Sequence, residues 1–271
     1  MADASTRLHA IIVIASRELD ALARQFGLSD SSIALEGLAL PAWQATVSPE
    51  RLLYPASMIK LPIAVALATR CEGGDLGWGD RVVVDAANLT ANDAPSPIVE
   101  GYRATLEELL RAMLSASDNV ATNVLIDVLG RETIAPACAP FGLRATAVRR
   151  KLSGSDPLID DPAATGRNAH PAADAALLLR AIALEAVPAA GLIYDALRAQ
   201  HWNDKLSRGL RDGDEFAHKT GETSQVSHDG GILKLPGGSR FILVVYTPLP
   251  SCPETDAKFA GFASAIRPYF D

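Results

Sequence analysis

Hydrophobic residues recur at helical spacing through the middle of the chain. The clearest pattern starts at residue 105, where Thr105 and Glu108 have the spacing of a capping box. One face of this helix is apolar and consists of Leu106, Leu109, Leu110, Met113 and Leu114. Similar periodicity predicts helices over residues 8–26, 57–70, 120–129, 171–185 and 191–200, and a last helix that carries Phe259, Phe262 and Ile266.

Short apolar runs bounded by turn residues predict strands near both ends of the chain. Two early strands cover residues 31–40 and 43–47, and three late strands cover 215–220, 231–235 and 240–247. The segment Pro236-Gly237-Gly238 turns a hairpin between the last two. The segments 85–102 and 154–168 are polar, lack a clear period and are predicted to be loops.

This order of elements predicts an α+β fold. We expect one antiparallel sheet built from both chain ends and covered by the terminal helices, with an all-helical domain inserted between its strands. Residues 1–50 and 205–271 would form the sheet domain, and residues 51–204 the helical domain. A ligand site is expected in the cleft between the two domains.

The composition of the chain narrows the possible partners. Hydrophobic residues make up 48% and charged residues 21%, which is ordinary for a globular protein, and the net charge is −7. We therefore expect no nucleic-acid partner, and because no apolar run reaches the roughly 18 residues of a membrane span, no membrane association. Cys71, Cys138 and Cys252 lie far apart and imply neither a disulfide framework nor a metal site, and we expect no cofactor.

The N-terminus allows two interpretations. Residues 8–15 are apolar, but the run is short, contains His9 and leads directly into the amphipathic pattern of Leu19, Leu22 and Phe26. A signal peptide would need a longer apolar core and a cleavage site before the fold begins. We expect a cytoplasmic protein whose first helix ends at Gly27 in a left-handed cap, with an export signal as the alternative.

Ser57 and Lys60 lie near the start of a predicted apolar helix, three residues apart. This spacing places the hydroxyl and the amine on one helical face. An amine held there away from water would have a lowered pKa and could accept the proton of the hydroxyl. The alternative is a capping serine beside a solvated lysine.

Two further motifs make that alternative weak. Ser117-Asp118-Asn119 lies at the junction of two predicted helices, and Lys219-Thr220-Gly221 lies at the end of a predicted strand. With these three motifs in this order, the sequence resembles the penicillin-recognising serine hydrolases, and class A β-lactamases in particular. The resemblance covers nearly the whole chain, including Asn123 and the late hairpin, and implies the α/α-β sandwich of the β-lactamase/transpeptidase fold.

The resemblance assigns catalytic roles to three residues. Ser57 would be the nucleophile that forms an acyl-enzyme, and Lys60 would be the base or proton relay. Ser117 would pass the proton to the leaving nitrogen. The substrate would be a small acyl compound, and the resemblance leaves the oligomeric state open.

It also assigns substrate contacts. Asn119 would hold the acylamide side chain, and Lys219 and Thr220 would hold a carboxylate. Gly221 would let the ligand approach the strand edge, and the backbone N–H groups of Ser57 and Glu222 would form the oxyanion hole.

Other polar residues near these motifs are expected to be structural. His218, His228 and Asp229 read as strand residues within the sheet. Asn123 is expected to tie its helix to the long loop.

The chain departs from the class A pattern at two points. The loop glutamate that activates the deacylating water is missing: the position falls near Ser153-Gly154, and no Glu lies between Glu132 and Glu185. Asp156 could substitute for it if the loop is reshaped. Glu222 places a negative charge where a substrate carboxylate would dock.

We therefore expect acylation of Ser57 by a β-lactam or a related amide or ester, with weak β-lactam turnover. A D-Ala peptidase or esterase is one alternative. A non-hydrolysing, sensor-like module that only binds the acyl group is the other.

Overall fold

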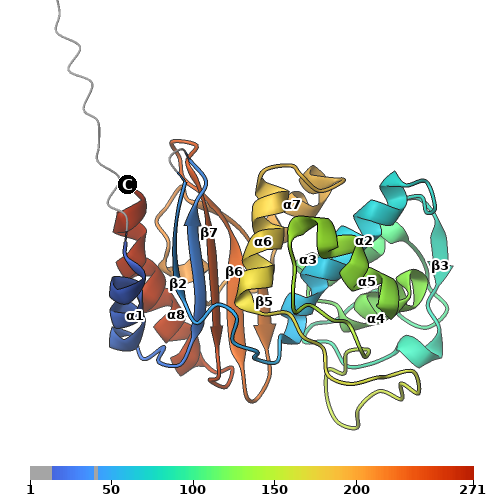
Figure 1. The fold of residues 1–271 in the computed structure, drawn as a ribbon. Helices are drawn as coiled ribbons and strands as arrows, with labels where there is room; N and C mark the ends of the chain where they lie inside the picture. Colours follow the sequence, from blue (N-terminus) through green and yellow to red (C-terminus); the bar gives the residue numbers. More distant parts are fainter. Residues whose placement is uncertain (1–13, 40–41) are drawn as a thin grey trace, which may run out of the picture.

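The computed structural model describes residues 14–39 and 42–271. Its centre is a five-stranded sheet in the order β2-β1-β7-β6-β5, in which all neighbours run antiparallel. The strands are β1 Ser32–Gly37, β2 Trp43–Val47, β5 Glu215–Glu222, β6 Ser227–Lys234 and β7 Arg240–Thr247. The sheet thus joins both ends of the chain, and the predicted α+β architecture is confirmed (Figure 1).

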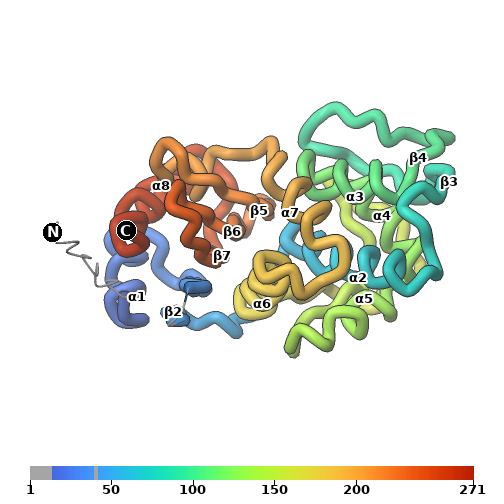
Figure 2. Tube along the Cα trace, turned by 90° about the horizontal axis from the view of Figure 1, so that it is seen from above, coloured from blue at the N-terminus to red at the C-terminus, as the bar shows by residue number. Residues whose placement is uncertain are grey.

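The two faces of the sheet belong to different cores. The terminal helices α1 (Ser16–Gln25) and α8 (Pro253–Ile266) cover one face, and α6 (Ala172–Ala183) packs on the other (Figures 1 and 2). Along β7, Phe241, Leu243 and Val245 join the core under the terminal helices, whereas the intervening Ile242, Val244 and Tyr246 join the core of the helical side. Residues 241–246 of this strand are all hydrophobic because successive side chains point to opposite faces and both faces are covered.

The helical side is built around α2 (Lys60–Glu72), whose first nine residues, 60–68, are all buried. Against it pack α3 (Leu106–Ser115), α4 (Asn119–Leu129) and α5 (Arg131–Cys138), whereas α7 (Ala190–Arg198) packs on α3 and β5. Pro62 is tolerated in α2 because it lies in the first turn, where backbone N–H groups have no partner within the helix. The predicted capping box of α3 is present, with Thr105 Oγ1 accepting from Glu108 N–H at 3.1 Å.

Two strands and one α-helix of the described residues were not predicted from the sequence. The strands β3 (Arg81–Val83) and β4 (Arg103–Thr105) pair with each other across the polar loop, and neither is long enough to show a period. Helix α5 contains Pro136, a residue that argues against a helix interior.

The predicted N-terminal helix begins later than expected. In the structure α1 starts at Ser16, and residues 8–13 of the prediction lie outside the described residues. Gly27 has a φ of +72°, as the left-handed cap requires. None of the helices in the described ranges is both long and apolar enough to cross a membrane.

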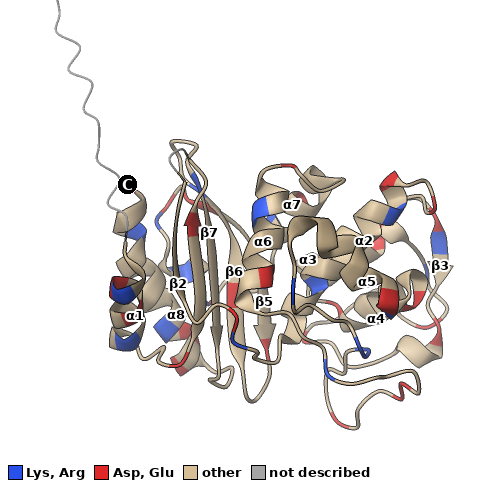
Figure 3. Ribbon diagram, in the orientation of Figure 1, with Lys and Arg blue, Asp and Glu red and all other residues tan. Residues whose placement is uncertain are grey.

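Charged residues of both signs are spread over the helices and strands (Figure 3).

The division into domains of residues 1–50 plus 205–271 and residues 51–204 stays a prediction.

Candidate active site

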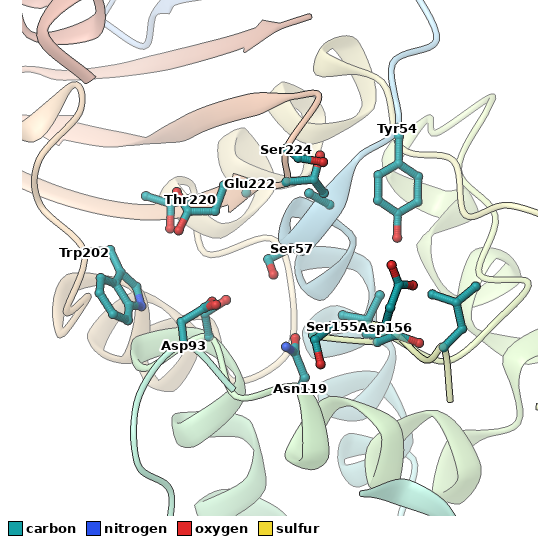
Figure 4. Close-up of a pocket in the computed structure, with 18 residues that line it drawn as sticks. Tyr54, Ser57, Asp93, Asn119, Ser155, Asp156, Trp202, Thr220, Glu222 and Ser224 are labelled. Carbon is teal, nitrogen blue, oxygen red and sulfur yellow. The ribbon is translucent and has the colours of Figure 1, made fainter. Parts of the chain in front are cut away.

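A pocket of about 440 Å³ contains the predicted nucleophile. One side, called here the strand side, is made by the end of β5 and the residues after it, Thr220, Gly221, Glu222, Thr223 and Ser224. The opposite side, the loop side, is made by Leu152, Ser153, Gly154, Ser155, Asp156 and Leu158. Ser57 lies between the two sides, and Asp93 and Trp202 lie at one end (Figure 4).

Ser57 lies in a 3-10 turn, Ala56–Ile59, that leads directly into α2. The preceding Ala56 has a φ of +46°, a conformation that costs energy for a residue with a side chain. The strained turn leaves Ser57 partly exposed at the pocket while its neighbours Ala56 and Met58 are buried. The chain therefore presents this hydroxyl on an otherwise buried segment.

Gly221 brings the end of β5 against the same turn. A Cβ atom on Gly221 would lie 3.0 Å from Pro55 O and 3.2 Å from Met58 N. A side chain at this position would crowd these backbone atoms, so glycine lets the sheet edge lie directly beside the Ser57 turn.

Lys60 is fully buried at the first position of α2 and contacts the junction between α3 and α4. Its Nζ lies 2.6 Å from Ser117 O, 3.0 Å from Ser117 Oγ and 2.9 Å from Asn119 Oδ1. Burial, followed by the nearby charge of Lys219, lowers the pKa of Lys60 well below its usual value.

A neutral Lys60 amine would fit these contacts. It has two N–H groups and one lone pair, so one of its three partners must be a donor. Ser117 is the only partner with a hydroxyl hydrogen to donate, since the other two acceptors are carbonyl oxygens. The geometry therefore connects the amine and the Ser117 hydroxyl along a path that a proton can follow.

The α3–α4 junction fixes Ser117 and Asn119. Ser117 has a φ of +59°, and Asp118 caps α4 by accepting from Ala121 N–H at 2.8 Å. Asn119 donates from Nδ2 to Ala91 O at 3.1 Å while its Oδ1 accepts from Lys60. One Nδ2 hydrogen of Asn119 is then left for a ligand in the pocket that it lines.

Lys219 is fully buried in β5 and donates to Thr220 O at 3.0 Å. Burial, followed by the charge of Lys205, lowers its pKa to about 7. Thr220 lines the pocket next to it, and neither Lys60 nor Lys219 is among the described residues that form the pocket surface. The two amines thus lie behind the surface that a ligand would touch.

Glu222 follows Gly221 on the strand side and is held by two neighbours. Its Oε2 accepts from Lys205 Nζ at 2.7 Å and from Ser251 Oγ at 2.8 Å. Burial by itself would raise the pKa of Glu222. The charge of Lys205 and the hydrogen bonds from Lys205 and Ser251 outweigh burial, so the pKa of Glu222 is lowered.

The loop side carries Asp156 rather than a glutamate. Asp156 is exposed and lines the pocket together with Ser153 and Gly154, where the sequence comparison placed the missing position. The loop is anchored at its start by Asn123, whose Nδ2 donates to Leu152 O at 2.9 Å and whose Oδ1 accepts from Leu152 N–H at 2.8 Å. This is the tie that the sequence predicted for Asn123.

The histidines and Asp229 make internal bonds. His218 Nδ1 lies 2.7 Å from Asp229 Oδ1, and Asp229 Oδ2 accepts from Leu206 N–H at 3.0 Å. His228 Nε2 lies 2.8 Å from Tyr54 O, which holds the approach to Ser57 against the sheet. All three side chains are buried and stabilise the segments around the pocket, in agreement with their structural interpretation.

The structure thus brings Ser57, Lys60, Ser117, Asn119 and the end of β5 together, and Asp156 lies on the facing loop. The sequence did not identify Asp93, Trp202 or Lys205. Asp93 lies in a polar loop that shows no hydrophobic periodicity. Lys205 has no sequence motif, and its pairing with Glu222 is evident only once the chain is folded. Across the described ranges there is no group of three or more His, Cys, Asp or Glu side chains suited to a metal ion.

Comparisons with known proteins identify the family of the chain. The family model described as "Beta-lactamase enzyme family" matches residues 15–270. A β-lactamase of Rhodobacter capsulatus is 26% identical over 231 residues, which are 83% of this chain and 76% of that protein.

Solved structures share the fold at low sequence identity. An acyl-enzyme complex of a PBP-A mutant with penicillin G has a TM-score of 0.80 at 23% identity. The match covers 94% of this chain and 95% of the PBP-A chain. A β-lactamase from Sphaerobacter thermophilus has a TM-score of 0.78 at 24% identity, and the match covers 94% of this chain and 98% of the β-lactamase. The family model spans almost the whole chain, and the chain therefore belongs to the β-lactamase enzyme family, a family of hydrolases.

Proposed function

We propose that the chain is a serine hydrolase that acts on a small β-lactam, amide or ester through an acyl group on Ser57. The observation that carries the proposal is the buried Lys60, bonded to Ser117 and Asn119 beside the partly exposed Ser57. Burial lowers the pKa of this amine, which makes it a better acceptor for the proton of an activated serine.

The acylation step uses three residues. Ser57 Oγ attacks the carbonyl carbon, a C–O bond forms, and the bond from that carbon to the leaving nitrogen or oxygen breaks. The Ser57 proton passes to Lys60, and Ser117 gives its own proton to the leaving atom and is reprotonated by Lys60. The backbone N–H groups of Ser57 and Glu222 would stabilise the oxyanion.

Substrate contacts would come from the same pocket. Asn119 retains one amide hydrogen for an acylamide carbonyl. Thr220 would contact the far end of the substrate with Lys219 buried behind it, and Gly221 leaves room for the substrate beside the strand. The penicillin G acyl-enzyme of the PBP-A mutant supports acylation by a β-lactam as the first compound to test.

Deacylation is expected to be slow with β-lactams. The loop side offers Asp156 and no glutamate to activate a water. An aspartate is one methylene shorter, and losing a positioned base costs on the order of 10²–10⁴ in rate. We propose Asp156 as the substitute base in any turnover that occurs.

The D-Ala peptidase or esterase and the non-hydrolysing acyl-binding module are the alternatives. Benzylpenicillin and a p-nitrophenyl ester separate them when intact-protein mass and product release are followed together. Product release with transient adduct supports the hydrolase, and a stable adduct without product supports the binding module.

Ser57→Ala should abolish the adduct, and peptide mapping should locate it on Ser57 in the unaltered protein. An adduct that persists in Ser57→Ala would contradict the proposal. The cytoplasmic location belongs to the same proposal, and fractionation of the native host tests it.

A further inference from the structure

Glu222 lines the pocket and is paired with a buried lysine that lies outside the pocket lining. Its Oε2 is 2.7 Å from Lys205 Nζ and accepts from Ser251 Oγ at 2.8 Å. The side chain of Lys205 is 4% exposed and that of Glu222 is 35% exposed. The buried ammonium therefore has a carboxylate of the protein itself as its partner, and that carboxylate faces the pocket.

Lys219 contributes little positive charge to the pocket. It is fully buried, donates to Thr220 O, and is absent from the described residues of the pocket surface. With a pKa lowered to about 7, it carries only part of a charge at neutral pH. An incoming anion would gain little from it.

The charged side chains that line the pocket are all acidic. Among the described lining residues they are Asp93, Asp156 and Glu222, and none is Lys or Arg. Asp93 and Asp156 are exposed residues without an ion pair within 4.0 Å in the described part of the chain, so their charges are not offset by a direct partner. A negatively charged group entering here is repelled, and a positively charged group is attracted.

We infer that Glu222 determines the charge of the substrate: its carboxylate lines the strand side next to Thr220, where the carboxylate of an acyl donor would dock, so the pocket selects donors that are neutral or cationic at that end. This inference rests on the proposed function, since it concerns the same acylation of Ser57. Specificity of this kind comes from an interaction that disfavours the wrong ligand. Thr220 lines the pocket and is 4% exposed, and its hydroxyl would form a hydrogen bond with such a neutral group.

The test uses three donors with one reactive ring: benzylpenicillin, its methyl ester and its choline ester. They differ in carrying an anion, no charge or a cation at the same position. The rate constant for adduct formation is measured by intact-protein mass, with each donor's spontaneous hydrolysis subtracted. We expect the methyl and choline esters to acylate Ser57 at least about tenfold faster than benzylpenicillin, because like charges a few ångströms apart repel strongly in a poorly solvated pocket.

Glu222→Gln removes the charge and keeps the shape. In this variant the repulsion by Glu222 is lost and the charge of Lys205 is no longer neutralised by its partner, so the preference for the esters should fall by about tenfold. Glu72→Gln, which removes an exposed acid at the end of α2, is the matched control and should leave the preference unchanged. Raising the ionic strength should also reduce the preference of the unaltered protein, and this measurement needs no variant.

The outcomes separate the two proposals. If benzylpenicillin acylates Ser57 as fast as its methyl ester, or if Glu222→Gln leaves the preference unchanged, the inference is overturned and the proposed function stands. If no donor acylates Ser57 in any variant, the proposed function fails, and the inference with it.

Discussion

At the scale of single residues, the site depends on amines that are kept out of water. Lys60 and Lys219 are both fully buried, and burial lowers the pKa of each. The charge of Lys219 lowers the pKa of Lys60 further, and the charge of Lys205 lowers that of Lys219 further. Burial of a cation costs free energy, which the fold avoids by releasing the proton. The same property that would make Lys60 a base also makes the stability of the protein depend on pH.

Lys219 should make the folded state less stable as the pH falls from about 10 to 7. Its pKa is lowered from 10.5 to about 7, so in this window the unfolded chain binds a proton that the folded chain does not. Stability therefore rises with pH across the window, and the penalty is complete below pH 7. Lys219→Met removes the penalty and should increase the free energy of unfolding at pH 8 on the order of 3 kcal/mol, with the gain falling below about 1 kcal/mol near pH 10.5.

Urea denaturation at pH 8 and pH 10.5 measures this difference. The exposed Lys234→Met is the control, and its effect should be similar at both pH values. A gain for Lys219→Met that does not shrink at high pH would contradict the buried, neutral state of this lysine.

Ser117→Ala tests the proton path. The Ser117 hydroxyl lies 3.0 Å from Lys60 Nζ, and without it the leaving group has no donor. The rate of Ser57 acylation by benzylpenicillin, whose leaving nitrogen must gain a proton, should fall by about 10²–10⁴, with little change in the melting temperature. Ser115→Ala removes a hydroxyl that only bonds Arg111 O at 2.7 Å, and it should keep full activity. Equal rates for the two variants would exclude Ser117 from proton transfer.

At the scale of elements, the site is made where helices and strands end. Ser57 lies in the turn before α2, Ser117 between α3 and α4, and Glu222 at the end of β5. Such ends carry unpaired backbone groups and leave side chains free to face a cavity. The loop side differs because it has no helix or strand between residues 153 and 168 and depends on side-chain bonds for its position.

Asn123→Ala should release this loop. Asn123 makes two bonds with the backbone of Leu152, and their loss leaves buried groups unpaired, at a cost of about 1–3 kcal/mol in the free energy of unfolding. Hydrogen exchange should accelerate over residues 152–168. Thr122→Ala, which removes a neighbouring buried bond to Asp118 O, should destabilise α4 without this local effect. Unchanged exchange in the loop would show that other bonds, such as that of Arg131 with Asp161, are enough to hold it.

At the scale of the whole molecule, function depends on the contact between the sheet edge and the helical side. The strand order leaves β5 at the edge, and Gly221 lets that edge touch the Ser57 turn. The core on each side of β7 then keeps both parts in one arrangement.

Gly221→Ala should move the two parts apart by a few tenths of an ångström. Its Cβ would meet backbone atoms of Pro55 and Met58, which cannot rotate away as a side chain can. We expect a loss of about 1–3 kcal/mol in stability, the usual cost of an overpacked contact, and a larger relative loss of acylation rate. Gly237→Ala, at a hairpin turn with no atom within 4 Å of the new Cβ, should affect neither. Wild-type acylation by Gly221→Ala would contradict the importance of this contact.

The sequence by itself determined the local elements and the motif residues. The periods of α3, α4 and α6 and the five sheet strands follow from which side chains must be buried, and motifs such as Ser57 with Lys60 are fixed by covalent order. Elements that depend on a distant partner were missed: β3 and β4 stabilise each other, and α5 is formed despite Pro136. The segment before residue 14 is outside the described residues.

Only the tertiary structure decided how the site residues act on one another. Lys60 and Ser117 are 57 residues apart in the chain, and Lys205 and Glu222 are 17 apart, yet each pair is in hydrogen-bond contact. Burial and charge depend on which segments pack together, and they set the pKa of each amine and the sign of the pocket. The physical reason is that spacing along the chain fixes only neighbours within a few residues, whereas solvation and electrostatics depend on distance in space.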